Sequence, residues 1–340
     1  MLDGIRVLDL SRLLPGGHCT RILADMGAEV IKVEEPSRGD PLRALPGGEI
    51  YFRQLHWGKR SIGLRLNTAP GVGALKRLVA AADVLVEGFR PGVMERRGIG
   101  FSELALVNPR LVYCAITGYG STGALKRRAG HDLSYLARSG VLSLMPKASG
   151  APVIPGIQVA DLAGGQAAVV AILGAIIERA RTGRGQRVEI AMAAVMREWG
   201  ALSNEVRRAG IAGVELTGGW PCYHVYPVRD GFLTVAALEP PFWVEFCQAI
   251  GREDLSSAQR DPAAVAEVES ALKPRTRSEW ATIFADRDVC VEPVFEAGEI
   301  PSTAVAIAPA VGQHTREVLE EAGFSPSEIT AVSSPARAAG

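Results

Sequence analysis

The sequence predicts an α/β protein, with a large domain built on a mostly parallel sheet and a smaller α+β domain. Short apolar runs alternate with helical stretches over residues 5–120, which is typical of parallel strands joined by helices. The chain has 340 residues, of which 47% are hydrophobic, so it is long enough to form two cores. After residue 213 the pattern changes to a hairpin followed by amphipathic helices.

The large domain begins with a predicted strand, helix and second strand. The strands are "IRVLDL" at 5–10 and "AEVIKVE" at 28–34, and the residues between them have helical spacing up to Met26. The turn after the first strand contains "PGGHCT", which lacks the GxGxxG spacing of a dinucleotide-binding turn. The sequence therefore does not favour NAD as the ligand.

Further strands and helices follow at 73–89 and 108–120. A run of apolar and small residues at 162–180 predicts a long buried helix that "RTGRGQ" ends, and "RVEIAM" follows as a strand. Asp161 stands directly ahead of this helix. It is either the N-cap, accepting a bond from a free N–H group of the first turn, or a catalytic carboxylate at the mouth of a site.

The smaller domain begins with a predicted hairpin, "YHVYPVRDGFLTVAAL", which turns at Asp230-Gly231. Amphipathic helices follow at 242–250 and 278–286. The segment "GQHTREVLEEAGFSPSEI" predicts one polar helix and a short capped turn, and the tail "SSPARAAG" is expected to fray. The domain boundaries that we predict are 1–200, 214–300 and 301–340, with the last segment returning to the large domain.

Composition argues against several classes of function. The 37 basic and 37 acidic residues balance, so no overall charge favours nucleic acid or an anionic membrane. Asp3 and Asp9 interrupt any N-terminal signal peptide, and the longest apolar run, 167–177, is too short to span a membrane. The five cysteines are scattered without a CxxC pair. We therefore expect a soluble, cytoplasmic protein without disulfides, structural zinc, nucleic-acid partners or membrane partners.

Basic residues follow several of the predicted strands. They lie where an open α/β sheet binds its ligands. Arginine holds phosphate with paired hydrogen bonds, so the set favours a phosphorylated ligand over the alternative of solvated surface charges. The residues are Arg38, Lys59, Arg60, Arg90 and Arg96.

Two further side chains are candidates for acid/base chemistry. His131 precedes a helical run, and Glu239 comes directly after an apolar strand and ahead of Pro240 and Pro241. Each also has an ordinary structural interpretation, His131 as a structural histidine and Glu239 as part of a turn or cap. The residues alone leave both alternatives open.

Eight stretches carry a resemblance to a known family. In order they are "GIRVLDLSRLLPG", "LADMGAEVIKVEEPSRGDPLR", "GKRSIGLRL", "ADVLVEGFRPGVMERRGIG", "NPRLVYCAITGYGSTG", "VADLAGG", "RTGRGQRVEIAM" and "GQHT". With them the chain resembles the family III CoA-transferases (CaiB/BaiF), a family that also contains the α-methylacyl-CoA racemases. The resemblance implies a Rossmann-like large domain and an interlocked homodimer, with each active site between the large domain of one chain and the small domain of the other.

The resemblance also implies roles for individual residues. The acid of "VADLAGG", here Asp161, is the family's catalytic carboxylate. Racemases oppose it with the histidine of "GHDLSYLARSG", here His131, and support that histidine with the glutamate of "LEPPFW", here Glu239. No metal or permanently bound cofactor is implied, because coenzyme A arrives as part of the acyl-CoA thioester substrate. The implied coenzyme A contacts are Arg38, Lys59, Gly88, Phe89, Arg90, Arg96 and Tyr119.

The catalytic trio fits the chemistry of racemisation. Inverting a carbon beside a thioester removes a proton from one face and returns one to the other, so two acid/base groups must flank it. The enolate oxygen needs donors, which we expect from the free N–H groups at the start of the 162–180 helix. Glu239 bonded to the imidazole would fix its tautomer. The resemblance therefore favours a 2-methylacyl-CoA racemase, ahead of a CoA-transferase with Asp161 as nucleophile and a non-catalytic CoA-thioester binder.

Two features depart from the family pattern. Only "EAGEIPSTAVAI" bridges "CVEPVF" and "APAVGQHT", where the family usually carries a longer stretch. Gly88 stands where many relatives have asparagine. The first departure shortens the connection between the small domain and the last helix, and the second leaves only backbone groups for one expected contact to coenzyme A.

Overall fold

The computed structural model describes residues 1–211, 216–301 and 306–333. The chain divides into two compact units, the first formed by Met1–Ala201 with Ala304–Gly340 and the second by Leu202–Thr303. Each unit is described by itself. The predicted boundary at residue 214 and residues 334–340 of the tail lie outside the described residues.

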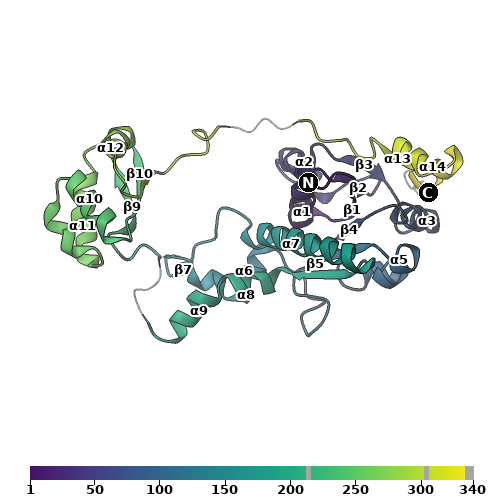
Figure 1. The fold of residues 1–340 in the computed structure, drawn as a ribbon, viewed down its shortest axis with the longest axis horizontal. Helices are drawn as coiled ribbons and strands as arrows, with labels where there is room; N and C mark the ends of the chain where they lie inside the picture. The colour runs from purple at the N-terminus through teal and green to yellow at the C-terminus, as the bar shows by residue number, and fades with distance from the viewer. Residues whose placement is uncertain (212–215, 302–305, 334–340) are drawn as a thin grey trace. The chain divides into compact units, whose positions relative to one another are not determined.

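The first unit is built on a six-stranded sheet (Figure 1). The strand order is β3-β2-β1-β4-β5-β8, and every neighbouring pair is parallel. This order confirms the predicted α/β class with a Rossmann-like parallel sheet. The strands are β1 (Arg6–Asp9), β2 (Glu29–Glu34), β3 (Arg60–Gly63), β4 (Val84–Glu87), β5 (Val112–Thr117) and β8 (Arg187–Ala191).

Helices cover both faces of this sheet. Successive strand residues point to opposite faces, so Val7 of β1 joins one core and Leu8 joins the other. Both faces are covered at the central strands β4 and β5, whose residues are all buried and almost all apolar. The first core includes residues of α1 (Leu13–Asp25), α6 (Asp132–Ser139), α7 (Val159–Thr182) and α8 (Met192–Trp199), and the second includes residues of α3 (Ala69–Val79), α5 (Phe101–Val107), α13 (Thr315–Glu321) and α14 (Pro326–Ser333).

Shorter elements also belong to this unit. A two-stranded antiparallel hairpin precedes α7, and α9 begins at the last residue of the first unit's N-terminal segment. These elements are α2 (Gly48–His56), α4 (Val93–Arg96), β6 (Lys147–Ala148) and β7 (Ala151–Pro152), whereas α9 (Ala201–Arg208) belongs to the second unit except for its first residue.

The glycines of α7 allow it to pack closely against two neighbouring helices. By length and composition this helix would suffice to cross a membrane, but it contributes a row of buried residues to the core of the first unit. A Cβ added at Gly164 would lie 2.6 Å from Met192 Cγ of α8, and one added at Gly165 would lie 2.6 Å from the Pro15 carbonyl oxygen of α1. The small residues of "LAGG" therefore bring the start of α7, with Asp161, against the start of α1.

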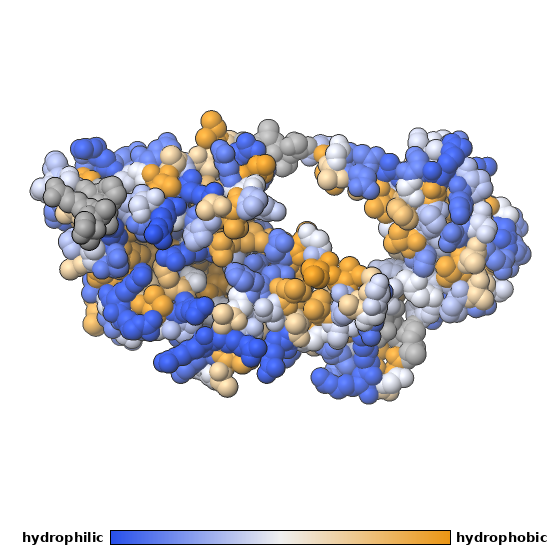
Figure 2. All heavy atoms as spheres, turned by 180° about the vertical axis from the view of Figure 1, so that it is seen from behind, coloured by the Kyte–Doolittle hydropathy of each residue, from blue (hydrophilic) through white to orange (hydrophobic). Residues whose placement is uncertain are grey.

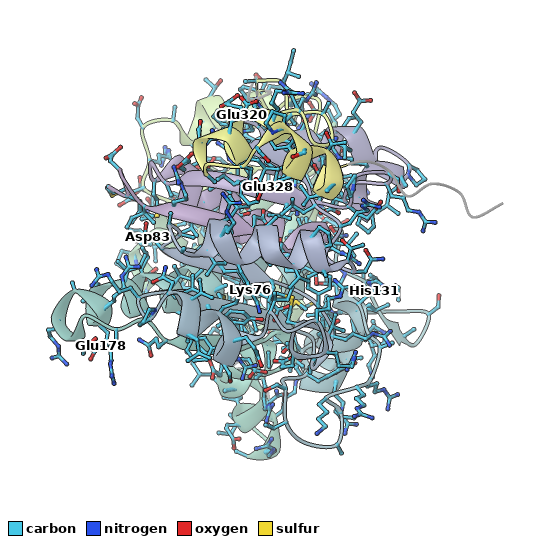
Figure 3. All side chains as sticks on the ribbon, turned by 90° about the vertical axis from the view of Figure 1, so that its right-hand side faces the viewer. Lys76, Asp83, His131, Glu178, Glu320 and Glu328 are labelled. Carbon is cyan, nitrogen blue, oxygen red and sulfur yellow. The ribbon has the colours of Figure 1, made fainter. Side chains whose placement is uncertain are left out.

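The C-terminal segment packs on the first unit. The His314 N–H group donates to the Ser61 carbonyl oxygen at 2.8 Å, and Arg77 of α3 pairs with Glu328 of α14 at 2.9 Å. Figure 3 shows α13 and α14 on the α3 side of the sheet. The predicted capped turn at this end is instead the helix α14, since Ser325 and Glu328 bond to each other's backbone N–H groups at its start.

The second unit is a small α+β fold, as predicted. Its antiparallel sheet has the order β11-β10-β9, and Val228 pairs with Gly231 across the expected hairpin turn. Helices α10 and α12 correspond to the two predicted amphipathic helices, and their buried side chains include Trp243 and Trp280. The elements are β9 (Tyr223–Val228), β10 (Gly231–Ala236), α10 (Pro240–Ala249), α11 (Val265–Leu272), α12 (Arg277–Phe284) and β11 (Val291–Pro293).

Several large apolar side chains remain exposed on both units. Val170 and Ile177 on α7 are each 71% exposed, and Val225 and Phe232 on the unit 2 sheet are 52% and 48% exposed. Figure 2 shows hydrophobic surface interrupted by hydrophilic surface on the face that it draws. Exposed apolar patches of this kind are typical of contact surfaces.

Candidate active site

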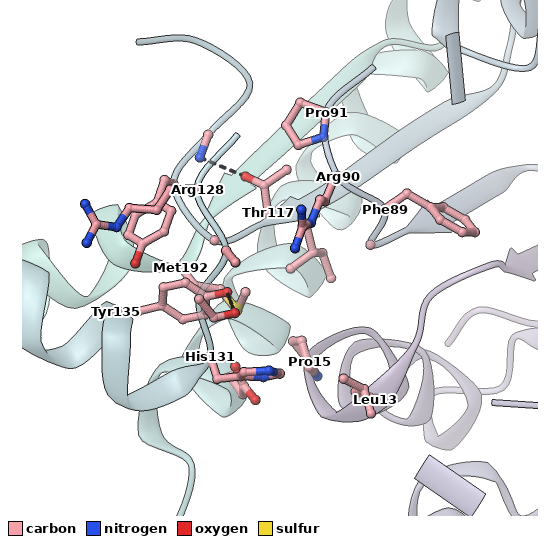
Figure 4. A pocket seen from close by; sticks show the side chains of 18 of the residues that line it. Leu13, Pro15, Phe89, Arg90, Pro91, Thr117, Arg128, His131, Tyr135 and Met192 are labelled. Carbon is pink, nitrogen blue, oxygen red and sulfur yellow. Dashed lines mark hydrogen bonds between the residues drawn. The ribbon is translucent and has the colours of Figure 1, made fainter. Parts of the chain in front are cut away.

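A cavity of about 300 Å³ opens at the carboxyl ends of β1, β4 and β5 (Figure 4). Its walls include residues between Arg12 and Gly16 after β1, residues 88–91 after β4, and residues 116–120 at the end of β5. Strand β1 leads to β2 on one side of the sheet and β4 leads to β5 on the other. The cavity therefore lies at the switch point of the sheet, where open α/β folds bind their ligands.

The cavity brings His131 and Asp161 together. His131 is the N-cap residue of α6 and has an exposed side chain, while Asp161 lies in the first turn of α7 and is half-buried. Figure 4 shows the His131 ring directed toward Pro15 at the start of α1. The Tyr135 hydroxyl donates to the Gly130 carbonyl oxygen at 2.6 Å, which ties α6 to the loop that leads into His131.

Asp161 is not the N-cap of its helix, so that interpretation is wrong. Helix α7 begins at Val159, with Gln158 at the cap position, and Asp161 is its third residue. The capping oxygen comes from another helix, because Asp132 Oδ1 accepts the N–H groups of Ala160 at 2.6 Å and of Asp161 at 3.1 Å. Asp161 therefore has no capping role that would explain its place in the sequence.

The expected oxyanion donors at the start of α7 are already bonded. Two of the N–H groups donate to Asp132. The Val159 N–H group donates to the Ile157 carbonyl oxygen at 3.1 Å, and the Leu162 N–H group donates to the Gln158 carbonyl oxygen at 3.0 Å. The helix starts earlier than the predicted 162–180, so its unpaired N–H groups belong to earlier residues, and Asp132 and the preceding loop satisfy them. The prediction that this turn holds the enolate oxygen is wrong.

The surroundings of Asp161 make it more basic than an ordinary aspartate. Its pKa is raised to about 7, first because burial penalises the charged carboxylate and second because the Asp132 carboxylate lies nearby. Near neutral pH such a group populates both its protonated and its ionised form. Asp161 is therefore suited to both giving and taking a proton.

Glu239 belongs to the second unit. It occupies the N-cap position of α10, between β10 and Pro240, and its exposed side chain makes no capping bond. His131 belongs to the first unit. The expected bond between Glu239 and His131 stays a prediction.

Four of the residues expected to bind coenzyme A line the cavity, namely Gly88, Phe89, Arg90 and Tyr119. Arg90 points into the cavity in Figure 4. A Cβ added at Gly88 would lie 3.8 Å from the Ile116 carbonyl oxygen, an ordinary van der Waals contact, so a side chain would fit there without a clash. The Tyr119 ring packs edge-on against Tyr135, with 5.2 Å between ring centroids.

Two arginines that the sequence analysis missed flank Phe89. The guanidinium carbons of Arg12 and Arg97 lie 4.7 and 5.3 Å from the centroid of its ring. All three residues line a second cavity of about 190 Å³. Burial lowers the pKa of Arg97, and the charges of Arg12 and Arg96 lower it further, so positive charge gathers here. Their positions in the sequence could have identified them, because Arg12 follows β1 and Arg97 ends the motif "FRPGVMERR".

The other three expected coenzyme A contacts lie elsewhere. Arg38 and Arg96 are exposed and are not among the residues that line these two cavities. Lys59 is 3% exposed, and its ammonium group donates to Thr20 Oγ1 at 2.6 Å and lies 3.4 Å from Asp9 Oδ2. The structure therefore gives Lys59 a place in a buried charge network beneath α1, out of reach of a phosphate group.

The lining of the larger cavity includes several basic side chains and aromatic rings. Within the described ranges, no group of three or more His, Cys, Asp or Glu side chains is arranged to hold a metal ion. Arg12, Arg90, Lys126 and Arg128 all line the larger cavity. Basic side chains in this number suit a ligand that carries phosphate groups.

Comparisons with known proteins identify the family of the chain. The sequence model of CoA-transferase family III matches residues 2–328. The chain is 35% identical to α-methylacyl-CoA racemase of Mus musculus, over 97% of this chain and 95% of the relative. It is also 35% identical to succinate–glutarate CoA-transferase of Agrobacterium fabrum, over 81% of this chain and 72% of the relative.

A solved structure supports the same assignment. The crystal structure of a CAIB/BAIF family protein from Brucella suis matches with a TM-score of 0.81 and 27% identity, over 94% of this chain and 99% of that chain. Both the sequence model and the fold thus extend over nearly the whole chain. The chain belongs to the CoA-transferase family III.

Proposed function

We propose that the protein is a racemase of 2-methylacyl-CoA thioesters that moves the α-proton from one face of the carbon to the other through an enolate. The observation that carries the proposal is that His131 and Asp161 line one cavity from the starts of two packed helices. Inversion requires two such groups in one site. One group takes the α-proton while the other donates a proton to the opposite face, and the roles exchange for the other epimer.

The acidity of Asp161 supports acid/base chemistry at this residue. Its pKa of about 7 leaves both protonation states populated near neutrality. A racemase needs both states, because the carboxyl acts as acid toward one epimer and as base toward the other. A nucleophilic carboxylate needs only the ionised form.

A CoA-transferase is the second candidate, because a relative with that activity has the same identity to this chain as the racemase. In that reaction the Asp161 carboxylate attacks the thioester carbonyl and releases CoA thiolate, leaving an acyl-aspartyl anhydride. CoA thiolate then attacks the aspartyl carbonyl, releases the first acid and leaves an aspartyl-CoA thioester for the acceptor acid. No step in this sequence requires His131.

We further propose that the active enzyme is a cytoplasmic homodimer in which Glu239 of the partner subunit orients the His131 ring. The exposed apolar residues Val225 and Phe232 on the sheet of the second unit support a contact surface there. Coenzyme A enters and leaves as part of the substrate, and no other cofactor takes part in the proposed reaction.

Isotope exchange tests the proposed reaction. The enzyme is incubated with one epimer of a 2-methylacyl-CoA in deuterated water, without an acceptor acid. We expect deuterium at the α-carbon and formation of both epimers. Formation of the second epimer should be lost in Asp161→Asn and in His131→Ala, although the base that remains can still exchange the α-proton of one epimer. Both processes should be retained in Lys147→Ala, whose side chain is exposed on β6. Transfer of CoA to an added acid with the α-hydrogen retained, together with an Asp161 adduct trapped by hydroxylamine, would instead identify a transferase. If neither reaction occurs over a broad substrate panel, a CoA-thioester binder remains.

A further inference from the structure

Asp132 connects the two helices that carry the proposed acid/base pair. It is the first residue of α6, next to His131, and its Oδ1 atom accepts the N–H groups of Ala160 and Asp161 in α7. A helix usually takes its capping oxygen from its own N-cap residue. Here Gln158 makes no side-chain capping bond, and the oxygen comes from a residue 28 positions away in the chain.

These bonds determine where α7 begins. They engage the second and third residues of the helix, at 2.6 and 3.1 Å, and bonds from N–H groups to an ionised oxygen are stronger than neutral ones. The bonds therefore hold the backbone from which the Asp161 side chain projects. Because Asp132 also begins α6, they hold that backbone at a set distance from His131.

The charge of Asp132 acts on the same carboxyl group. After burial, it is the second cause of the raised pKa of Asp161. None of the other titratable or charged groups that line the cavity or pack on α7 near Asp161 is a carboxyl group, so the negative charge that opposes ionisation of Asp161 comes from Asp132. These other groups are His131 and Tyr135 from α6, Arg90 after β4, Tyr119, Lys126 and Arg128 between β5 and α6, and Arg12 and His18 at the start of α1.

We propose that Asp132 is a positioning residue that fixes the start of α7, and with it Asp161, relative to His131. The proposal rests on the acid/base roles proposed above for these two residues. Asp132 acts through the backbone of Asp161 and through its own charge, without touching the reacting carbon. A displacement of about 1 Å at a reacting group lowers a rate by about 100-fold, so the position of this helix start matters for turnover.

Two substitutions separate the bonds from the charge. Asp132→Asn keeps an acceptor oxygen and removes the charge, whereas Asp132→Ala removes both. The matched controls are Asp261→Asn and Asp261→Ala, because Asp261 in the second unit accepts the Ala263 N–H group at 3.0 Å in a comparable cap. For each variant, kcat and KM with a 2-methylacyl-CoA are measured against pH, and the Asp161 carboxyl is titrated by carbon NMR in the free enzyme.

We expect kcat of Asp132→Ala to fall about 10- to 100-fold with little change in KM, since Phe89 and Arg90 lie on other elements. In Asp132→Asn the pKa of Asp161 should fall, because the neighbouring negative charge is gone. For the epimer from which Asp161 takes the proton, the low-pH limb of the kcat profile should then move to lower pH. The loss of kcat should be much smaller than in the alanine variant. The two Asp261 variants should leave kcat, its pH profile and the Asp161 titration unchanged.

Two results would overturn the proposal: wild-type kcat in folded Asp132→Ala, or an unchanged Asp161 titration in Asp132→Asn. If the alanine variant does not fold, the asparagine variant decides. Failure of the proposed function has a different signature. If the wild-type enzyme does not racemise but the Asp161 titration still shifts in Asp132→Asn, the link between Asp132 and Asp161 stands and only the reaction assigned to the pair falls.

Discussion

Asp161 shows how a site residue can oppose the stability of its own fold. The unfolded chain ionises this carboxyl at its ordinary pKa of 3.8, whereas in the folded protein the pKa is about 7. At pH values between these two pKa values, the carboxyl is ionised in the unfolded chain but still largely protonated in the folded protein. Raising the pH through this range therefore progressively favours unfolding. The effect is absent below pH 3.8 and complete above about pH 7.

We therefore predict that Asp161→Asn stabilises the protein at pH 8 and has little effect at pH 4, because asparagine has the same shape and no charge to bury. Calorimetric Tm values for both proteins at each pH measure this difference. Glu87 is a second buried acid with a pKa raised to about 7, but it is present in both proteins and therefore affects both Tm values equally. Asp3→Asn serves as the control, since the Asp3 side chain is 91% exposed. An equal gain in Tm at both pH values would contradict the assigned cause.

At the scale of elements, the turns after β1 and β4 form the walls of both cavities. Glu87, the last residue of β4, accepts the Phe89 N–H group at 2.7 Å, which holds the turn that presents Phe89 and Arg90. On the other side, buried Lys59 bonds within the first turns of α1 through Thr20 and the Gly17 carbonyl oxygen. Glu87 and Lys59 thus support the walls of the two cavities without lining them.

We predict that Arg12→Ala and Arg97→Ala each weaken binding of a CoA thioester about tenfold, because each removes a charged contact beside Phe89. Arg38→Ala and Arg96→Ala are the matched controls, with smaller losses expected because both side chains are exposed and outside the cavities. Calorimetric titration at low and high salt measures the effect, and the loss should be larger at low salt. Greater losses of affinity in Arg38→Ala and Arg96→Ala would instead support the coenzyme A contacts predicted from the sequence, which include both residues.

At the scale of the whole molecule, the proposed site combines residues of two different units. His131 and Asp161 belong to the first unit and Glu239 to the second. In a homodimer with shared sites, His131 of one chain would work with Glu239 of the partner subunit. A hybrid dimer can then contain one intact site even though each chain carries a defect.

We predict that a hybrid of one His131→Ala chain and one Glu239→Ala chain recovers up to about half of the wild-type activity, because one of its two sites contains both native side chains. The hybrid is purified with two different affinity tags and compared with the two mutant homodimers, which serve as controls. Activity no higher than in these homodimers would place both residues of a site in the same chain.

The sequence by itself determined the α/β class, the family and the choice of His131 and Asp161 as candidate acid/base residues, because apolar periodicity and short motifs are local properties of the chain. Only the tertiary structure decided that Asp132 caps α7, that Lys59 is buried, and that Arg12 and Arg97 flank Phe89. The contacts of Asp132, Lys59 and Arg12 join residues far apart in sequence. They depend on how α1, α6, α7 and the turns after β1 and β4 pack beside the sheet. A local pattern can mark an acid ahead of an apolar run, but only packing decides which carboxylate bonds to the N–H groups at the start of the helix.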